Sequence, residues 1–213
     1  MVVHNRIGKA QALALLLPQS KFVFRIRDAD SKVYLTFDDG PHPEFTPRLL
    51  DLLGELEVPA TFFCIGRNLG RHVELAARTH REGHTLGNHS FCHQRFASLP
   101  RAAQLQEVAQ TDRLLREVTG KQVHPFRAPQ GNWSAGLLLG LMSRGIQCVH
   151  WSFDSLDYQK APTIEFIHRM KATSLVSGDV MLFHDDGELC VEALRELIPW
   201  WRAQGITFAA LPR

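Results

Sequence analysis

The chain carries the stretch Val33-Tyr34-Leu35-Thr36-Phe37-Asp38-Asp39-Gly40-Pro41, an apolar run that ends in two adjacent carboxylates and a Gly-Pro turn. A run of β-branched and aromatic residues bounded by turn residues is typical of a strand. Further along, His89-Ser90-Phe91-Cys92-His93 places two imidazoles four residues apart. Carboxylate and imidazole together are ligands of hydrolytic divalent-metal sites, so the sequence indicates a metal-dependent enzyme.

Short apolar runs alternate with helix-length amphipathic segments along the rest of the chain. We expect strands at 33–37, 60–64, 85–88, 123–127, 147–152, 180–184 and 206–210, with an optional extra strand at 22–26. We expect a helix that Thr46 caps and Pro47 begins, and further helices at 71–82, 100–119, 134–144, 162–173 and 190–204. This alternation is typical of parallel strands covered by helices.

The number of repeats and the places of the polar motifs favour a barrel. Seven repeats in 213 residues predict an α/β fold, a single-domain distorted (β/α)7-type barrel. An open doubly wound sheet is the alternative. Polar residues follow the ends of successive predicted strands, and in a parallel barrel these ends converge on one face. These residues are Asp38, Asp39, His89, Arg127, Asp154, Asp157 and His184.

The composition is that of an ordinary globular protein. The chain is 45% hydrophobic and 22% charged, with a formal net charge of +2. It has no dense run of Lys and Arg, so we expect no nucleic-acid partner. No apolar stretch is long enough for a transmembrane segment. The four cysteines form no CxxC pair and are expected to be reduced.

The first 31 residues are the least regular part of the sequence. We assign 1–31 to an N-terminal extension packed on the domain and 32–213 to the domain itself. The apolar run 12–17 follows Arg6 and Lys9, as in a signal peptide, but it is short and no small-residue cleavage site follows it. A helix packed on the domain is the favoured interpretation, and a cytoplasmic location is the matching expectation.

Asp39, His89 and His93 are the expected metal ligands. Residues four apart on one helical turn share a face, so both rings can reach one ion. A polar turn is the plainer alternative, because the chain has 11 histidines and such pairs arise by chance. Asp-Gly-Pro is also good turn chemistry, but a turn needs only one carboxylate. Two histidines and one aspartate leave coordination positions open, as in catalytic zinc sites, and cobalt, nickel or iron also accept such ligands.

The remaining polar residues can supply acid–base chemistry. With the other carboxylate on the ion, Asp38 is free to act as a base, and Arg127 can hold it ionised through a bidentate pair. An ordinary ion pair is the plainer role for Arg127. His184 closes an apolar strand, where a core histidine is common, but beside a metal it is a candidate general acid. Asp154 or Asp157 can orient it.

Five motifs of this sequence resemble those of the polysaccharide deacetylase superfamily, also called the NodB homology domain or carbohydrate esterase family 4. They occur in the same order as in that family. The likeness is greatest to the chitooligosaccharide deacetylase type. TFDDGP is intact at 36–41 and H-[ST]-x-x-H at 89–93. The third motif, R-x-P-Y/F-G, appears as Arg127-Ala128-Pro129-Gln130-Gly131, with Gln130 in place of the aromatic residue. The fourth motif, D-x-x-D-W, appears as Asp154-Ser155-Leu156-Asp157-Tyr158, with Tyr158 in place of Trp. The fifth motif, L-x-H, is Leu182-Phe183-His184.

The resemblance implies a distorted barrel that binds one divalent metal ion and removes N-acetyl groups from N-acetylglucosamine-type glycans. It implies that Tyr158 and Leu182 flank the acetyl methyl group and that the backbone N–H of Gln130 faces the oxyanion. The implied acid–base residues are Asp38, its tether Arg127, His184 and its tether Asp157. The implied metal ligands are Asp39, His89 and His93, and the implied substrate-binding residues are Pro129, Gln130, Gly131, Tyr158 and Leu182.

Two other functions are kept as alternatives. A related barrel hydrolase that acts on a sugar formamide, a cyclic amide or acetylxylan needs the same kind of centre. A non-catalytic sugar-binding barrel that has kept its metal is expected to lose the base or the acid, whereas Asp38 and His184 are both present. The expected partner is therefore an acetylated amino-sugar oligosaccharide or glycan.

Overall fold

The computed structural model of the chain describes residues 2–27, 30–93 and 96–212. Its central strand is β2 (Lys32–Asp38), in which every residue except Lys32 is buried. Burial on both faces is typical of a strand inside a parallel sheet. β2 pairs in parallel with β3 (Thr61–Cys64) on one side and with β7 (Val180–His184) on the other. β4 (Thr85–Asn88) and β6 (Phe153–Asp154) continue the sheet beyond them, again in parallel.

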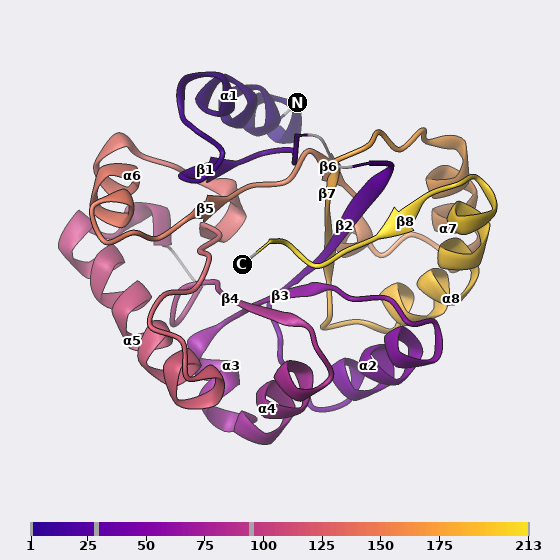
Figure 1. Cartoon of the computed structure of the whole chain (residues 1–213), viewed down its shortest axis with the longest axis horizontal. Coiled ribbons are helices and arrows are strands. Elements are labelled where there is room, and N and C mark those ends of the chain that lie inside the picture. Colours follow the sequence, from indigo (N-terminus) through magenta and orange to yellow (C-terminus); the bar gives the residue numbers. More distant parts are fainter. Residues whose placement is uncertain (1, 28–29, 94–95, 213) are drawn as a thin grey trace.

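Short strands and one bridging residue close this sheet into a barrel. β1 (Phe22–Val23) pairs with β5 (Cys148–Val149). Phe126 forms parallel bridges to the last residue of β4 and to the first residue of β5. The chain runs on from β5 to β6, which pairs with β7. The predicted distorted barrel is confirmed, and Figure 1 shows its strands surrounded by helices.

The predicted strand at 123–127 is reduced to a single bridging residue. Only Phe126 pairs with strands on both sides. Pro125 has no N–H group to donate to a ladder, so regular pairing cannot extend through it. This part of the wall is held instead by Asn88 N, which donates to Pro125 O (2.8 Å), and by Arg127 N, which donates to Asn88 O (2.9 Å).

Two further predicted strands are also shorter than expected. The segment 147–152 contributes β5 at its start, and β6 begins only after it. At 206–210 the strand is β8 (Thr207–Phe208), which pairs with Lys32 and Val33 at the start of β2. β8 therefore lies at one end of the barrel and pairs only with the first two residues of β2.

The predicted helices are all present, and one helix was not predicted. The additional helix is α3, whose Gly66 and Gly70 lower its intrinsic helix propensity. The helices are α1 (Val2–Leu16), α2 (Phe45–Glu55), α3 (Gly66–Arg71), α4 (Val73–Arg81), α5 (Arg101–Thr119), α6 (Ala135–Met142), α7 (Thr163–Ala172) and α8 (Glu188–Ala203). Single 3₁₀ turns lie at Phe96–Ser98, Pro129–Gly131 and Asp157–Gln159.

The start of α2 differs from the prediction. Glu44 occupies the N-cap position, and its side chain makes no capping hydrogen bond. Thr46 lies inside the first turn and is buried, where its hydroxyl accepts from His42 N (2.7 Å) and donates to the Asp185 carboxylate. A tertiary partner has therefore replaced the local capping role that the sequence suggested.

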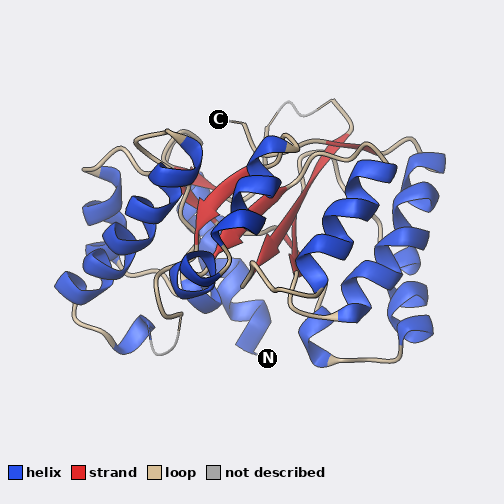
Figure 2. Ribbon diagram, turned by 90° about the horizontal axis from the view of Figure 1, so that it is seen from below, coloured by secondary structure: helices blue, strands red, loops and turns tan. Residues whose placement is uncertain are grey.

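The helices bury two apolar cores against the strands. The larger core fills the space between β2, β3, β7 and the helices α2, α7 and α8. In the second, Ala10, Leu13 and Ala14 of α1 pack with residues of β1, α5 and α6. Figure 2 shows the strands in the middle with helices on both sides. The proposed division of the chain at residue 31 stays a prediction, although β1 pairs with β5 inside the barrel wall.

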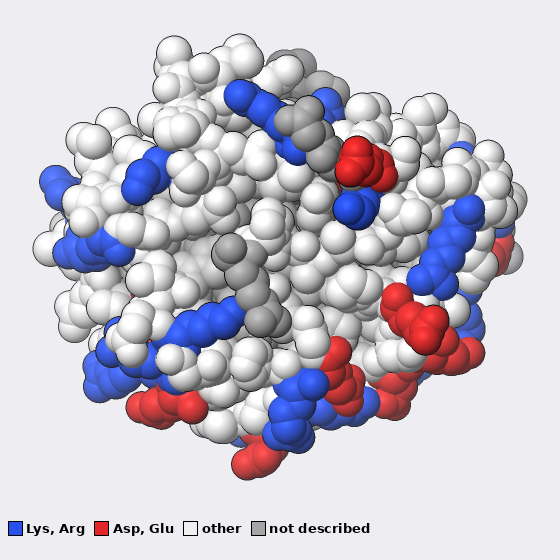
Figure 3. Space-filling view, in the orientation of Figure 1, with Lys and Arg blue, Asp and Glu red and all other residues white. Residues whose placement is uncertain are grey.

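The helical surface carries charges of both signs. On the face shown in Figure 3, Lys or Arg and Asp or Glu groups are interspersed along one edge. Ion pairs link neighbouring helices, for example Arg78 of α4 with Asp51 of α2, and Arg195 of α8 with Glu55 of α2. Exposed pairs of this kind contribute little to stability, from 0 to about 1 kcal/mol each. Among the helices of the described segments, none combines the length and apolar character needed to cross a membrane.

Candidate active site

Three of the predicted side chains meet at the carboxyl ends of the strands. One ligand atom each from Asp39, His89 and His93 lies within 4.8 Å of the other two. The Nε2 atoms of both histidines lie 3.6 Å from Asp39 Oδ1. This oxygen is buried and has no hydrogen-bond partner among the described residues. A buried oxygen acceptor without a partner is energetically costly. A divalent cation bound between this oxygen and the two imidazole nitrogens would supply the missing partner.

The two histidines do not lie on a helix, contrary to the prediction. They lie in a loop that begins where β4 ends. The loop brings the rings together because Ser90 and His93 both have positive φ angles, 67° and 65°. Asp39 also has a positive φ of 79°. Left-handed conformations of residues other than glycine are uncommon, and they concentrate at functional sites.

The Nδ1 atom of His89 lies 2.9 Å from the backbone carbonyl oxygen of Arg127. Because a carbonyl only accepts, Nδ1 must carry the proton, which leaves the Nε2 lone pair directed to the cluster. Burial lowers the pKa of His89, against the opposing effect of Asp38 and Asp39. The neutral imidazole, which is the form that binds a metal, is therefore favoured.

Asp38 is held by an arginine that lies entirely inside the barrel. Arg127 has 0% of its surface exposed, and its Nη1 donates to both Asp38 Oδ1 and Thr36 Oγ1 at 2.7 Å. The guanidinium also lies over the ring of Phe63, 4.2 Å from its centroid. The other Asp38 oxygen, Oδ2, is 3.5 Å from His89 Nε2. The predicted contact forms, but through one guanidinium nitrogen instead of a bidentate pair.

His184 is the register partner of Asp38 in the β2–β7 ladder. Its Nδ1 lies 2.8 Å from Asp157 Oδ1, and its backbone N–H donates to Asp157 Oδ2 at 2.7 Å. Burial acts to lower the pKa of His184, but the hydrogen bond and charge of Asp157, together with Asp38 and Asp39, raise it to about 10. Of the two aspartates that the sequence offered as its partner, Asp157 makes the contact.

One cavity of about 320 Å³ is lined by Asp38, Asp39, His89, His93 and His184. Gln130, Tyr158 and Leu182, all implied by the family resemblance, line it as well. Pro129 and Gly131 are buried next to Gln130. Gly131 has a φ of 66°, and a Cβ atom there would lie 2.6 Å from a ring carbon of His150, so only glycine fits.

Two further lining residues are absent from the set of predicted site residues, although the sequence suggested Asp154 as a possible partner of His184 and Trp151 as a residue that could stack on a sugar. Trp151 and Asp154 line the cavity, Trp151 with 5% of its surface exposed. Burial is the largest influence on Asp154 and raises its pKa. Trp151 follows β5 and Asp154 is the last residue of β6, so both lie near strand ends, where the site of a parallel barrel is built.

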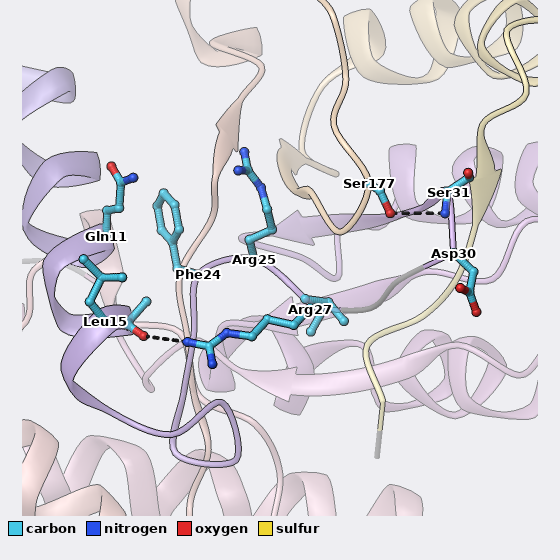
Figure 4. Close-up of a pocket in the computed structure, with 10 residues that line it drawn as sticks. Gln11, Leu15, Phe24, Arg25, Arg27, Asp30, Ser31 and Ser177 are labelled. Carbon is cyan, nitrogen blue, oxygen red and sulfur yellow. Dashed lines mark hydrogen bonds between the residues drawn. The ribbon is translucent and has the colours of Figure 1, made fainter.

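A larger hollow of about 610 Å³ lies elsewhere, between α1 and the segment that follows β1 (Figure 4). Gln11 and Leu15 of α1 line one side of it, and Phe24 and Arg27 line the other. Arg27 donates to Ala14 O (3.4 Å) across the gap. This hollow lies near the start of β2, whereas the cavity described above lies at its end, so cavity size alone does not locate the chemistry.

Comparison with known proteins agrees with this geometry. Residues 25–149 match the family model for polysaccharide deacetylase. The chitooligosaccharide deacetylase of Sinorhizobium fredii (strain NBRC 101917 / NGR234) is 36% identical over 195 residues, which cover 85% of this chain and 90% of the relative. The chain belongs to the polysaccharide deacetylase family.

Other members are similar over much of their length. A peptidoglycan-N-acetylglucosamine deacetylase of Bacillus cereus is 32% identical over 186 residues, which cover 85% of this chain and 67% of the relative. The crystal structure of the Bc1960 peptidoglycan N-acetylglucosamine deacetylase in complex with 4-naphthalen-1-yl-N-oxidanyl-benzamide has a TM-score of 0.85 and 30% identity. That match covers 90% of this chain and 91% of the other.

Membership makes the chain a carbohydrate esterase family 4 deacetylase, which is a hydrolase. The predicted family, fold and enzyme class are confirmed. The Asp39, His89 and His93 cluster is consistent with the metal site of this family. The glycan on which this chain acts is a narrower question, because relatives named for two different glycans have similar identities.

Proposed function

We propose that this chain removes N-acetyl groups from N-acetylglucosamine-type oligosaccharides, with chitooligosaccharides as the first substrate class to test. One observation carries the proposal. Asp38 and His184 occupy paired positions in adjacent strands, on the edge of the cluster formed by Asp39, His89 and His93. A proton acceptor and a proton donor thus flank one candidate metal centre, as hydrolysis of an amide requires.

Asp39, His89 and His93 would hold the cation, which we propose to be zinc. Two neutral imidazoles and one carboxylate are common ligands of catalytic zinc, and cobalt, nickel or iron fit the same atoms. When bound, such an ion polarises the acyl oxygen and lowers the pKa of water.

Asp38 is the proposed general base. It takes a proton from the water whose oxygen attacks the acetamide carbon. Arg127 serves this step because its Nη1 donates to Asp38 Oδ1, which fixes the position of the carboxylate and gives it a charged partner inside the barrel. The backbone N–H of Gln130 is proposed to donate to the oxyanion that develops on the acyl oxygen.

His184 is the proposed general acid. Its proton goes to the sugar nitrogen as the C–N bond breaks, which gives acetate and a free amine. Asp157 orients the ring and keeps it charged, since its carboxylate raises the pKa of His184. Tyr158 and Leu182 are proposed to flank the acetyl methyl group, in keeping with their place on the cavity wall.

Incubation of zinc-loaded protein with N-acetylated chitin oligomers tests the proposal. Mass spectrometry is expected to show losses of single acetyl groups, with equimolar release of acetate. Parallel reactions contain N-acetylated peptidoglycan fragments, because a Bacillus cereus relative is named for that substrate, and acetylxylan. Acetate from peptidoglycan alone would contradict the chitooligosaccharide assignment. Absence of hydrolysis with every substrate would favour a sugar-binding role.

A further inference from the structure

The loop that carries both histidine ligands needs support from outside itself. It leaves β4 after Asn88, and two of its residues, Ser90 and His93, have positive φ angles. Such conformations are strained in residues other than glycine, so the surrounding structure must hold them in place. Since the loop is not a helix, its N–H groups also need partners other than carbonyls one turn away.

His89, at the start of the loop, is anchored by the barrel itself. Its backbone N–H donates to Cys64 O (2.9 Å) in β3, and its ring Nδ1 lies 2.9 Å from Arg127 O. The position of this ring therefore follows from the packing of the strands. The same does not hold for His93, which lies beyond the last pairing of β4.

The middle of the loop is held by one carboxylate oxygen on α5. Glu107 Oε2 accepts from Phe91 N (3.0 Å) and from Cys92 N (2.7 Å). Two successive N–H groups that point to one place form a concave site that favours a negative charge. Hydrogen bonds to an ionised acceptor are about twice as strong as those between neutral groups.

Helix α3 holds the same segment from the other side. Gly66 N donates to Ser90 O (2.9 Å) and Arg67 N donates to Phe91 O (3.0 Å). The peptide groups around Phe91 are thus hydrogen-bonded on two sides: their carbonyls accept from α3, and their N–H groups donate to Glu107. The α3 contacts come from the backbone and cannot be removed by changing a side chain. Replacement of Glu107 removes the hydrogen bonds to the N–H groups of Phe91 and Cys92.

We propose that Glu107 is a positioning residue of the metal centre, which fixes His93 through the peptide groups of Phe91 and Cys92. This inference depends on the proposed metal centre but not on which glycan the enzyme hydrolyses. Without the Glu107 carboxylate, His89 and Asp39 keep their places. His93 then keeps the bond from its own N–H to Ser90 Oγ (2.9 Å), which lies within the same loop, so its distance to His89 and Asp39 is less firmly fixed. The expected result is weaker metal binding that excess metal overcomes, with the barrel still folded.

Zinc affinity of the metal-free protein tests this assignment, measured by competition with a chromophoric chelator. Glu107→Ala is expected to raise the Kd for zinc about 10–100-fold, the usual cost of losing a group that orients a ligand. Glu107→Gln is expected to raise it less, since the amide oxygen still accepts but carries no charge. Glu117→Ala is the matched control, because Glu117 is exposed on the same helix and is expected to leave the Kd unchanged.

Acetate release as a function of zinc concentration is the second measurement. The Glu107→Ala enzyme is expected to need more zinc for half-maximal activity and to approach the wild-type kcat at saturating zinc. A wild-type zinc Kd in Glu107→Ala would overturn the assignment, and so would equal shifts in Glu107→Ala and Glu117→Ala.

If Glu107→Ala does not fold, Glu107→Gln decides the matter. A raised zinc Kd then supports the assignment, and a wild-type Kd overturns it. The zinc titration also separates this inference from the substrate proposal. Protein that binds zinc tightly but releases no acetate from any glycan would contradict the proposed substrate and leave the Glu107 comparison intact.

Discussion

The inner part of the site and its rim are built very differently. In the inner part, Asp38 is 3% exposed and Arg127 is 0% exposed, and each makes hydrogen bonds within the barrel. At the rim, Tyr158 is 46% exposed, and Gln130, with a φ of 55°, is the exposed residue of the Pro129–Gly131 3₁₀ turn. The inner residues are those that match the family motifs, and the rim residues are those that depart from them.

This contrast separates the chemistry from the choice of substrate. A change in the inner part leaves a buried charge without its partner, which is costly. A change at the rim alters surface that solvent already reaches, so its cost is small. We therefore expect inner variants to lose metal, turnover or stability, and rim variants to change mainly substrate binding.

The largest effect is expected from His89→Ala. Removing one of three ligands should abolish stoichiometric zinc binding and acetate release together. Elemental analysis of dialysed protein and an acetate assay measure the two losses. His168→Ala, which changes an exposed histidine on α7, serves as the control. Retained activity with retained metal would contradict the ligand assignment.

Asp38→Asn should reduce kcat while the metal stays bound. Loss of a general base typically costs about 10²–10⁴-fold in rate. The amide can still accept from Arg127, so the fold and the zinc content should stay close to those of the wild type. Zinc analysis together with kcat is the measurement, and a variant with wild-type turnover would remove Asp38 from its proposed role.

Arg127→Met should lower stability as well as activity. It leaves the buried Asp38 carboxylate without its cation, and breaking a buried pair costs about 3–5 kcal/mol. Urea denaturation of the metal-free protein measures the free energy of unfolding. Arg113→Met, at an exposed position of α5, is the matched control and should change this energy little. If the two substitutions lowered the free energy of unfolding equally, the buried Arg127–Asp38 pair would not be a particular source of stability.

Asp157→Asn should move a pH profile without abolishing activity. The pKa of His184 is raised to about 10, with Asp157 as the main raising influence, so the variant should lose its acid form at lower pH. The alkaline limb of the kcat–pH profile is then expected to move to lower pH.

The same pairing should affect stability. A raised histidine pKa stabilises the fold below about pH 6.5, and this stabilisation disappears as the pH rises through about 10. The stability gap between wild type and variant should follow the same course, and an alkaline limb that stays in place would contradict the pairing.

The smallest effect is expected at the rim, from Tyr158→Ala. The Tyr158 ring packs edge-on against His184, with 5.6 Å between centroids. Loss of an aromatic contact of about 1 kcal/mol corresponds to roughly a five-fold change, which we expect in KM. Tyr158→Trp should retain the wild-type KM. A large fall in kcat with an unchanged KM would mean that the rim takes part in the chemistry.

The sequence predicted the parts of the fold that local pattern controls. Apolar runs located β2, β3, β4 and β7, and helical periodicity located α4 through α8. The candidate residues of the site could be proposed from the sequence because they lie at or just after the ends of strands, in motifs of fixed order. These residues could therefore be proposed from short local motifs, without knowledge of the fold.

Features that depend on tertiary contacts were not predictable. The loop conformation at His93 depends on a positive φ and on Glu107, which lies 14 residues further along the chain. Thr46 is a good capping residue by type, but it bonds to Asp185, far away in sequence. Phe126 bridges two strands where a longer strand was expected, because Pro125 interrupts the pattern.

The ladder between β2 and β7 has a consequence for how this enzyme can change. Asp38 and His184 are opposite each other in it, so the separation of their backbones is set by the spacing of adjacent strands, about 4.8 Å. A slip of one residue would turn either side chain to the opposite face. Insertions in the outer loops therefore leave the spacing of the proposed proton acceptor and donor unchanged, so the surface that contacts the glycan can vary while this spacing is kept.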